Sequence, residues 1–387
     1  MDVRTRCAKR LEGTREIGHP MALPIVPSST YDFADQAGVD QYYETGRGFL
    51  YARYENPTVR VAERFVADLE QAEEAACFGS GMAAISTTVL SSVRAGDRVA
   101  AQRELYGGTV GLLSQVLPQH GVTVEWLDAA EIAALEPSRI AGCKLLYLES
   151  PTNPALRIVD LARAARVGHE AGAIVAVDST FASPVLQQPI GLGVDLVIHS
   201  ATKYLGGHTD LVGGVVAGTR ERIEPIAKRR RVLGGTMDPF SAFLLVRGMR
   251  TLAVRVEAQC RSAALVASFL EQHPAVERVF YPGLESHPDR DVAERQMSGF
   301  GAMVAFEVAG GGEAAERVHD RLKLIARAAS LGGIESLVSI PARMSHRHLT
   351  PEQRKQAGIG DGLLRLSIGL EAPEDLIADL DQALRRG

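Results

Sequence analysis

The chain has 387 residues, of which 46% are hydrophobic and 23% are charged, so it can bury a large core and is not disordered as a whole. Its net charge of −5 gives no electrostatic reason to expect a nucleic acid or an anionic membrane as a partner. At roughly 150 residues per domain, the length predicts two or three domains.

The four cysteines, Cys7, Cys77, Cys143 and Cys260, are far apart and form no C-x-x-C pair. This spacing argues against a disulfide framework or a zinc site and is typical of a reducing compartment. The basic N-terminus is not followed by an apolar segment of signal-peptide length, and no run approaches the roughly 18 apolar residues of a membrane span. We therefore expect a cytoplasmic protein.

Residues 1–50 carry many turn residues and a polar, glycine-bearing stretch at 42–48. We expect this N-terminal arm to be irregular, either as a surface loop or as a strap onto a neighbouring subunit. From residue 56 the pattern changes, because Val61, Phe65 and Leu69 recur every four residues behind a proline suited to a first helical turn. A helix is predicted there.

Short apolar strands and helical stretches then alternate along the chain. The expected strands cover residues 98–101, 122–127, 144–150, 173–178 and 195–200. A helical stretch at 160–172 separates two of them. This alternation predicts an α/β fold with a parallel sheet covered on both faces, and ligands of such sheets bind at the carboxyl ends of the strands.

A long helical stretch at about 241–273 comes next, and after it the pattern becomes mixed α+β up to a final helix at 374–387. We place a domain boundary near residue 250. The predicted parts are the N-terminal arm at 1–50, a large ligand-binding domain at 51–250 and a smaller C-terminal α+β domain at 251–387.

Polar residues follow the strand ends of the large domain. Asp178 ends one strand, Lys203 follows the next, and a Gly-Ser-Gly turn at 79–81 opens a helix whose free N–H groups can bind phosphate. Taken singly, a surface lysine, a helix-capping aspartate and a common glycine turn are the simpler interpretations. Together they require one ligand with a phosphate, a cationic nitrogen and an aldehyde, which is the chemistry of pyridoxal phosphate.

Eight motifs then occur in order between residue 28 and the C-terminus. They are YARYENPT (51–58), FGSGMAAI (78–85), ELYGGT (104–109), ESPTNP (149–154), VDSTFASP (177–184), HSATKYLGGH (199–208), SLGGIESL (330–337) and LRLSIGLE (364–371). With them the chain resembles the Cys/Met-metabolism family of pyridoxal-phosphate enzymes. The resemblance implies the fold-type I transferase fold, with a mostly parallel, seven-stranded sheet in the large domain. It also implies a homo-oligomer, usually a tetramer built from two tight dimers.

The resemblance assigns the cofactor-binding residues. Lys203 forms a Schiff base with the aldehyde, and Asp178 pairs with the pyridinium nitrogen. The remaining implied contacts are Gly81, Met82, Ser200 and Thr202 at the phosphate, Tyr106 stacked on the ring, and Tyr51 and Arg53 reaching the phosphate from the neighbouring subunit. On residue type alone, Tyr51 and Arg53 would be an exposed loop pair, and Tyr106 a half-buried core residue.

The family also implies a substrate site and an activity. Arg365 binds the substrate α-carboxylate, and Ser330 and Asn153 line the same place. Without the family, Arg365 would be a strand-edge surface arginine. Lys203 takes the Cα proton and Tyr106 protonates the leaving group. The implied reaction is γ-elimination or γ-replacement on a sulfur amino acid. Cystathionine γ-lyase or γ-synthase is the main expectation, and methionine γ-lyase or cystathionine β-lyase are the alternatives.

Two departures from the family pattern leave the substrate open. Gly108 stands where methionine γ-lyases typically carry a cysteine, which weakens the methionine interpretation. Ala329 stands where cystathionine γ-lyases and γ-synthases often carry a glutamate that holds the distal end of the substrate. A charge that could hold a distal ammonium is therefore absent at that position.

Other classes are less well supported. A serine hydrolase using Ser80 lacks the G-x-S-x-G pattern, and GSGMAA at 79–84 matches the dinucleotide-binding fingerprint only in part. A non-catalytic scaffold would not need Lys203, Asp178, Tyr106 and Arg365. His346 and His348 have no carboxylate or cysteine cluster beside them in the sequence, so no metal site is expected.

Overall fold

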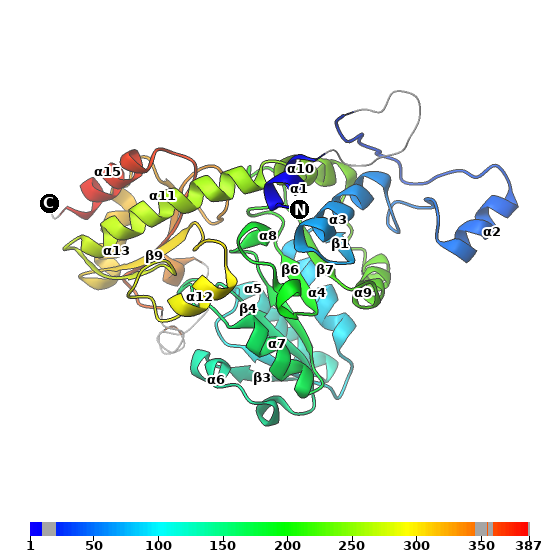
Figure 1. Cartoon of the computed structure of the whole chain (residues 1–387), viewed down its shortest axis with the longest axis horizontal. Helices are drawn as coiled ribbons and strands as arrows, with labels where there is room; N and C mark the ends of the chain where they lie inside the picture. The colour runs from blue at the N-terminus through cyan, green and yellow to red at the C-terminus, as the bar shows by residue number, and fades with distance from the viewer. Residues whose placement is uncertain (10–20, 345–353, 355–358, 386–387) are drawn as a thin grey trace.

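The computed structural model describes residues 1–9, 21–344, 354 and 359–385 of the chain (Figure 1). Its larger sheet has seven strands in the order β1 (Glu74–Phe78), β7 (Gly214–Gly218), β6 (Leu196–His199), β5 (Ile174–Asp178), β4 (Cys143–Glu149), β2 (Arg98–Gln102) and β3 (Thr123–Leu127). Every pairing from β6 across to β3 is parallel, and β7 runs antiparallel to both of its neighbours. The predicted α/β class with a mostly parallel sheet is confirmed.

Helices cover both faces of this sheet, which is why its central strands are mostly apolar. Tyr147 and Ile198 face one side, where α4 (Gly81–Ser92) and α9 (Arg220–Leu233) pack. Leu146 and Val197, one residue along each strand, face α7 (Leu161–Glu170) on the other side. The predicted helix after residue 56 is α3 (Pro57–Glu70), with Asn56 as its N-cap. The shorter helices of this region are α5 (Gly107–Gly111), α6 (Ala129–Ala133) and α8 (Ser183–Leu186).

The N-terminal arm contains two helices that the sequence analysis did not predict. α1 (Val3–Ala8) is capped by Asp2. α2 (Gln36–Thr45) has Asp35 as its N-cap and Gly46 as its C-cap, and the φ of 64° at Gly46 suits glycine. The expectation of a wholly irregular arm is therefore wrong, because short polar helices can be set by their caps without a clear apolar period. Figure 1 shows α2 standing away from the rest of the chain.

The helical stretch predicted at 241–273 is two helices, α10 (Pro239–Met249) and α11 (Leu252–Gln272). The break follows Gly248, where an added Cβ would lie 2.1 Å from the carbonyl oxygen of Gly206. At the break, the Thr251 hydroxyl donates to the Gly248 carbonyl and accepts from Arg255 Nε. These local bonds replace helical ones and let the chain turn.

A second sheet has the order β10 (Ala326–Arg327), β11 (Leu337–Ser339), β12 (Leu363–Ser367), β9 (Met303–Val308) and β8 (Val276–Phe280). The helices that accompany it are α12 (Arg290–Gln296), α13 (Gly311–Arg321) and α15 (Pro373–Leu384). The α+β pattern of this region is confirmed, whereas the proposed boundary at residue 250 stays a prediction. Arg157, in the loop after β4, binds Asp289 just before α12 at 2.5 and 2.9 Å and so links the two regions.

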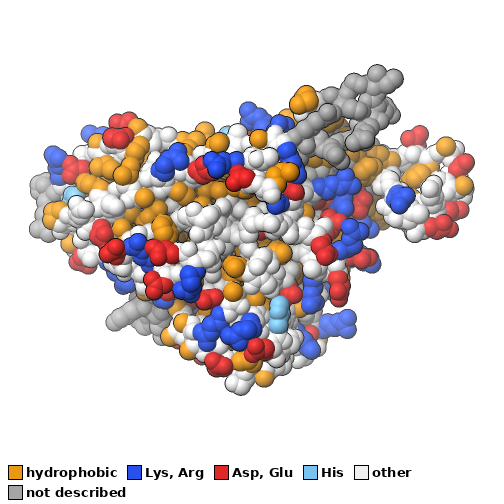
Figure 2. Space-filling view, in the orientation of Figure 1, with side chains coloured by type: hydrophobic (Ala, Val, Ile, Leu, Met, Phe, Trp, Pro, Cys, Tyr) orange, Lys and Arg blue, Asp and Glu red, His pale blue; other side chains and the backbone are white. Residues whose placement is uncertain are grey.

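The surface charges and the apolar character of the helices both bear on the partners that the chain could have. Figure 2 shows acidic and basic side chains interspersed over one face of the molecule. In the part of the chain that the structure describes, no helix combines the length and the apolar character needed to cross a membrane.

The close packing of β7 against the Gly-Ser-Gly turn predicts the effect of one substitution. A Cβ at Gly214 would lie 2.2 Å from the Ser80 carbonyl oxygen. Because this oxygen belongs to the backbone, it cannot move away from the added methyl group as a flexible side chain could. We expect Gly214→Ala to lower the free energy of unfolding by about 1–3 kcal/mol in urea titrations. Gly191→Ala is the control, because no atom lies within 4 Å of an added Cβ there. Equal destabilisation by both substitutions would contradict this reasoning.

Candidate active site at the carboxyl edge of the large sheet

The parallel register gathers the polar strand ends at one edge of the sheet. Glu149 and Asp178 are the last residues of β4 and β5, and they pair directly across the two strands. Tyr106 and Lys203 lie in the segments that follow β2 and β6. Residues far apart in the chain therefore surround one place, at the edge where ligands of such sheets bind.

Asp178 is buried and held rigidly. Its Oδ1 accepts hydrogen bonds from the backbone N–H of Thr180 at 3.0 Å and from the Thr180 hydroxyl at 2.5 Å. Burial raises the pKa of this carboxyl, while the two Thr180 bonds and the nearby His199 oppose the rise. The Thr180 hydroxyl also accepts from the Ser200 N–H at 2.9 Å, so Asp178 and the loop after β6 share one anchor.

The Gly-Ser-Gly turn packs against this loop without room for side chains. A Cβ on Gly81 would lie 3.0 Å from Ser200 Oγ, and one on Gly108 would lie 2.6 Å from Tyr106 Cε1 and 2.7 Å from Met82 Sδ. Gly81, Met82, Ser200 and Tyr106 therefore lie around the N-terminus of α4, which can bind a phosphate through its N–H groups.

Two hydroxyls near this turn have partners within the chain. The Ser80 side chain accepts from the Ala83 N–H at 3.0 Å and caps α4. The hydroxyl considered as a hydrolase nucleophile is thus a helix cap. Thr202 Oγ1 accepts from the Gly213 N–H at 2.9 Å and donates to the Gly213 carbonyl at 3.3 Å. Thr202 therefore ties the Lys203 loop to the chain entering β7.

Lys203 begins a line of hydrogen bonds across the site. Its Nζ donates to Ser330 Oγ at 2.8 Å, and the Ser330 carbonyl accepts from Arg365 Nη2 at 3.3 Å. Burial, and to a smaller extent the charge of Arg365, lowers the pKa of Lys203 to about 8. The neutral amine is therefore more populated near neutral pH than that of an ordinary lysine, although the ammonium is still the major form.

Arg365 is buried at the far end of this line. Its Nη1 donates to Asn153 Oδ1 at 2.8 Å, while its buried Nε has no hydrogen-bond partner among the described residues. Burial lowers its pKa to about 10, so the guanidinium stays charged at neutral pH. An unpaired donor on a buried cation suits an incoming carboxylate.

Glu149 is the residue that the sequence analysis missed. It is 4% exposed, and its oxygens accept from the Tyr106 N–H at 2.7 Å and the Asn153 N–H at 3.0 Å. Burial and the neighbouring Asp178 raise the pKa of this carboxyl well above its ordinary range. An acidic residue at the end of a buried strand was the available signal, and it is the same signal that singled out Asp178.

The described contacts of Tyr51 and Arg53 are with residues outside this group. Tyr51 is 42% exposed, and the Arg53 guanidinium lies 4.9 Å from the ring centroid of Tyr54 and donates to the Arg231 carbonyl at the end of α9. Neither residue makes a described hydrogen bond to Lys203, Asp178 or the Gly-Ser-Gly turn.

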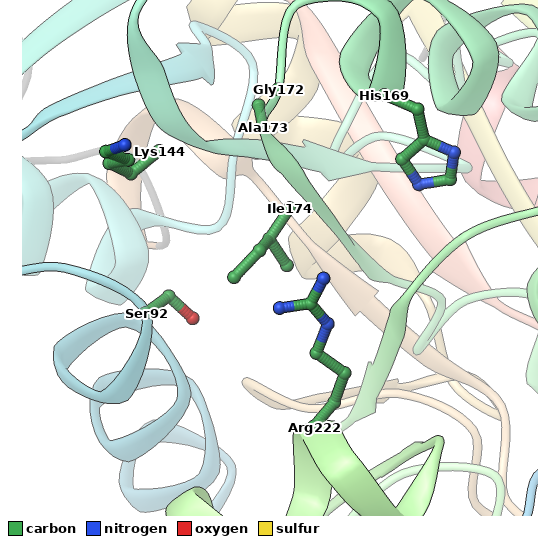
Figure 3. A pocket seen from close by; sticks show the side chains of 7 residues that line it. All are labelled: Ser92, Lys144, His169, Gly172, Ala173, Ile174 and Arg222. Atoms are coloured by element: carbon green, nitrogen blue, oxygen red, sulfur yellow. The ribbon is translucent and has the colours of Figure 1, made fainter.

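An open pocket of about 380 Å³ lies at the opposite edge of the sheet (Figure 3). Its lining residues are Ser92, Lys144, His169, Gly172, Ala173, Ile174 and Arg222. Lys144 and Ile174 are at the starts of β4 and β5, whereas Glu149 and Asp178 are at their ends. None of the predicted site residues lines this pocket.

Metal ligands are not gathered in the described part of the chain, where no group of three or more His, Cys, Asp or Glu side chains could hold an ion. His346 and His348 lie outside the described residues.

Comparison with known proteins gives consistent matches over nearly the whole chain. The family described as Cys/Met metabolism PLP-dependent enzyme matches residues 5–385. The L-methionine gamma-lyase of Fusobacterium nucleatum subsp. nucleatum is 42% identical over 383 residues, which cover 98% of this chain and 95% of that protein. The cystathionine gamma-lyase of Bacillus subtilis is 42% identical over 365 residues, 94% of each chain. A crystal structure of cystathionine gamma synthase from Xanthomonas oryzae pv. oryzae, in complex with aminoacrylate and cysteine, has a TM-score of 0.93 at 37% identity and covers 99% of this chain and 98% of its own.

The environment of Lys203 predicts how its amine titrates in the ligand-free protein. The rate at which an amine-reactive reagent modifies Lys203, followed by mass spectrometry, should rise through a midpoint near pH 8. Arg365→Gln should move this midpoint upward but leave it below the ordinary value of 10.5, because burial is the larger cause. Arg365→Lys keeps the charge and serves as the control. A wild-type midpoint near 10.5 would contradict the buried placement.

Proposed function

Since the chain belongs to the Cys/Met-metabolism family of pyridoxal-phosphate-dependent enzymes, we propose that it catalyses γ-elimination or γ-replacement on sulfur amino acids, as a cystathionine γ-lyase or γ-synthase. The observation that carries the proposal is the line Lys203–Ser330–Arg365. An amine that can act on Cα and a guanidinium that can bind a carboxylate are joined through one serine, which is the arrangement that an α-amino acid requires.

The residues present suit the family's cofactor. Lys203 would hold the aldehyde, since its lowered pKa leaves a reactive amine. Asp178 would face the ring nitrogen, and the pKa of its carboxyl should fall once that cation is beside it. Gly81, Met82, Ser200 and Thr202 would surround the phosphate, and Tyr106 would cover the ring. Bound pyridoxal phosphate supplies a sink for the electrons of the Cα–H bond.

Different side chains of this site would orient the substrate and transfer its protons. Arg365 and Asn153 would orient the substrate through its carboxylate, and Ser330 Oγ would direct Lys203 Nζ toward the Cα proton that this amine removes. The Tyr106 phenol would donate a proton to the departing γ-sulfur after a second proton has left Cβ. Addition of a thiol at Cγ completes replacement. Reaction with water instead gives 2-oxobutanoate and ammonia.

The substrate is the open part of the proposal. Methionine γ-lyase and cystathionine β-lyase activities are the alternatives within the family, and a non-catalytic scaffold is the alternative outside it. Ala329 is exposed in the structure and carries no carboxylate for a distal ammonium.

The decisive assay uses the purified protein with four substrates tested separately: cystathionine, homocysteine, methionine, and an O-acyl-homoserine with cysteine. We expect a yellow protein that bleaches with borohydride. It should either release 2-oxobutanoate from cystathionine or form cystathionine from the O-acyl-homoserine and cysteine. Lys203→Ala should be colourless and inactive. Pyruvate from cystathionine would indicate β-elimination, rapid turnover of methionine would favour the γ-lyase alternative, and a yellow but inert protein would favour the scaffold.

We further propose that the active unit is a cytoplasmic homo-oligomer, at least a dimer and as a larger assembly a tetramer. Three observations support it: Arg53 makes its described hydrogen bond to Arg231 and none to the other site residues, the arm extends from the molecule in Figure 1, and the four cysteines are free thiols. The arm of one subunit would then carry Tyr51 and Arg53 to the phosphate of its neighbour.

Mixing two inactive variants tests whether sites are shared between subunits. Arg53→Ala and Lys203→Ala should each be nearly inactive alone. After they are unfolded and refolded together, half of the dimers are hybrids with one intact site, so about a quarter of the wild-type activity should return. No recovery, with hybrids demonstrated by tagged subunits, would mean that Arg53 acts within its own chain.

A further inference from the structure

Glu149 connects two loops that each carry a group of the proposed site. Its Oε2 accepts from the backbone N–H of Tyr106, after β2, and its Oε1 accepts from the backbone N–H of Asn153, after β4. The backbone N–H of Glu149 itself donates to Gln102 Oε1 at 3.0 Å. The backbone of Glu149 is thus held by Gln102, and its side chain holds both loops.

The connection continues to the opposite side of the site. Asn153 Oδ1 accepts from Arg365 Nη1, and the Ser330 carbonyl, next along this line, accepts from Arg365 Nη2. From Tyr106 to Lys203, five hydrogen bonds therefore run through Glu149, Asn153, Arg365 and Ser330. Glu149 is the one member of this line that binds two backbone groups with a single side chain.

The charges around Glu149 do not explain its position by pairing alone. Asp178, its register partner on β5, repels it, and the charge of Arg365 attracts it. A buried acid beside a second acid is costly unless its oxygens are occupied. Here both oxygens accept hydrogen bonds from N–H groups of the two site loops. The side chain therefore lies where it sets the distance between these loops.

We propose that Glu149 is a positioning residue that sets the distance between the ring-covering Tyr106 and the carboxylate-binding pair Asn153–Arg365. The inference rests on the proposed function and adds to it the residue that aligns substrate and cofactor. A shift of either loop would move the substrate carboxylate relative to the ring. A displacement of about 1 Å between reacting groups can lower a reaction rate about a hundredfold.

Glu149→Gln and Glu149→Asp test this in the loaded enzyme. The amide keeps one acceptor but turns N–H groups toward one backbone N–H, and aspartate keeps the carboxyl group but withdraws it by one methylene. Both variants should raise KM for cystathionine by about tenfold or more and weaken pyridoxal phosphate binding, with a changed circular dichroism of the bound cofactor. Having two variants keeps the test decisive if one of them fails to fold.

Glu63→Gln is the matched control. Glu63 is as buried as Glu149, at 3% exposure, but its partners are Arg230, Arg60 and the Cys77 N–H, none of which belongs to the site. It should lower the midpoint of thermal unfolding without changing KM or the cofactor spectrum. If the Glu149 variants behave in the same way, Glu149 is a stability residue and the inference is wrong.

A double-mutant cycle with Asn153→Ala separates positioning from independent effects. If Glu149 acts on the substrate through Asn153, Glu149→Gln should raise KM by less than about threefold in the Asn153→Ala background. Multiplicative effects would overturn the inference. These outcomes are read relative to an active wild type, so an inactive or colourless wild type would instead refute the proposed function.

Discussion

The parallel pairing of β4, β5 and β6 is the constraint on which the site depends. Because these strands run in the same direction and in register, Glu149 and Asp178 end beside each other, and the loop with Lys203 leaves the sheet at the same edge. Backbone hydrogen bonds, rather than any attraction between the polar groups, bring the acids and the amine together. Repulsion between the two buried carboxyls is tolerated because each accepts hydrogen bonds from nearby N–H or hydroxyl groups.

Burial acts on the two kinds of titratable group in opposite directions. It lowers the pKa of Lys203 and raises the pKa values of Asp178 and Glu149, so in each case the neutral form becomes more accessible. For Lys203 the result is a nucleophilic amine near neutral pH. For Asp178 the result is a carboxyl whose charge a cationic ring nitrogen would stabilise, so the environment is prepared for a ligand of that charge.

The relatives show how far the common fold limits function. Proteins of similar identity to this chain carry the names L-methionine gamma-lyase, O-succinylhomoserine sulfhydrylase and cystathionine gamma-lyase. One fold therefore carries several named activities, so the fold alone does not decide the substrate. Under the proposed function, Ala329 leaves an exposed methyl group where a charged side chain could have selected a substrate.

The amino-acid sequence by itself determined the α/β class, the five strands from β6 across to β3 and the helix α3, because apolar periodicity is a local signal. Its ordered motifs predicted the roles of Lys203, Asp178, Tyr106 and Arg365. It did not reveal the helices of the arm, the break at Thr251, or the strands β1 and β7, whose small residues give a weak pattern. Only the tertiary structure revealed Glu149 as a link between two loops and the hydrogen bond from Arg53 to the Arg231 carbonyl. Both are matters of distance between segments far apart in the chain, and hydrogen bonds across 43 residues, as between Glu149 and Tyr106, leave no periodic trace in a sequence.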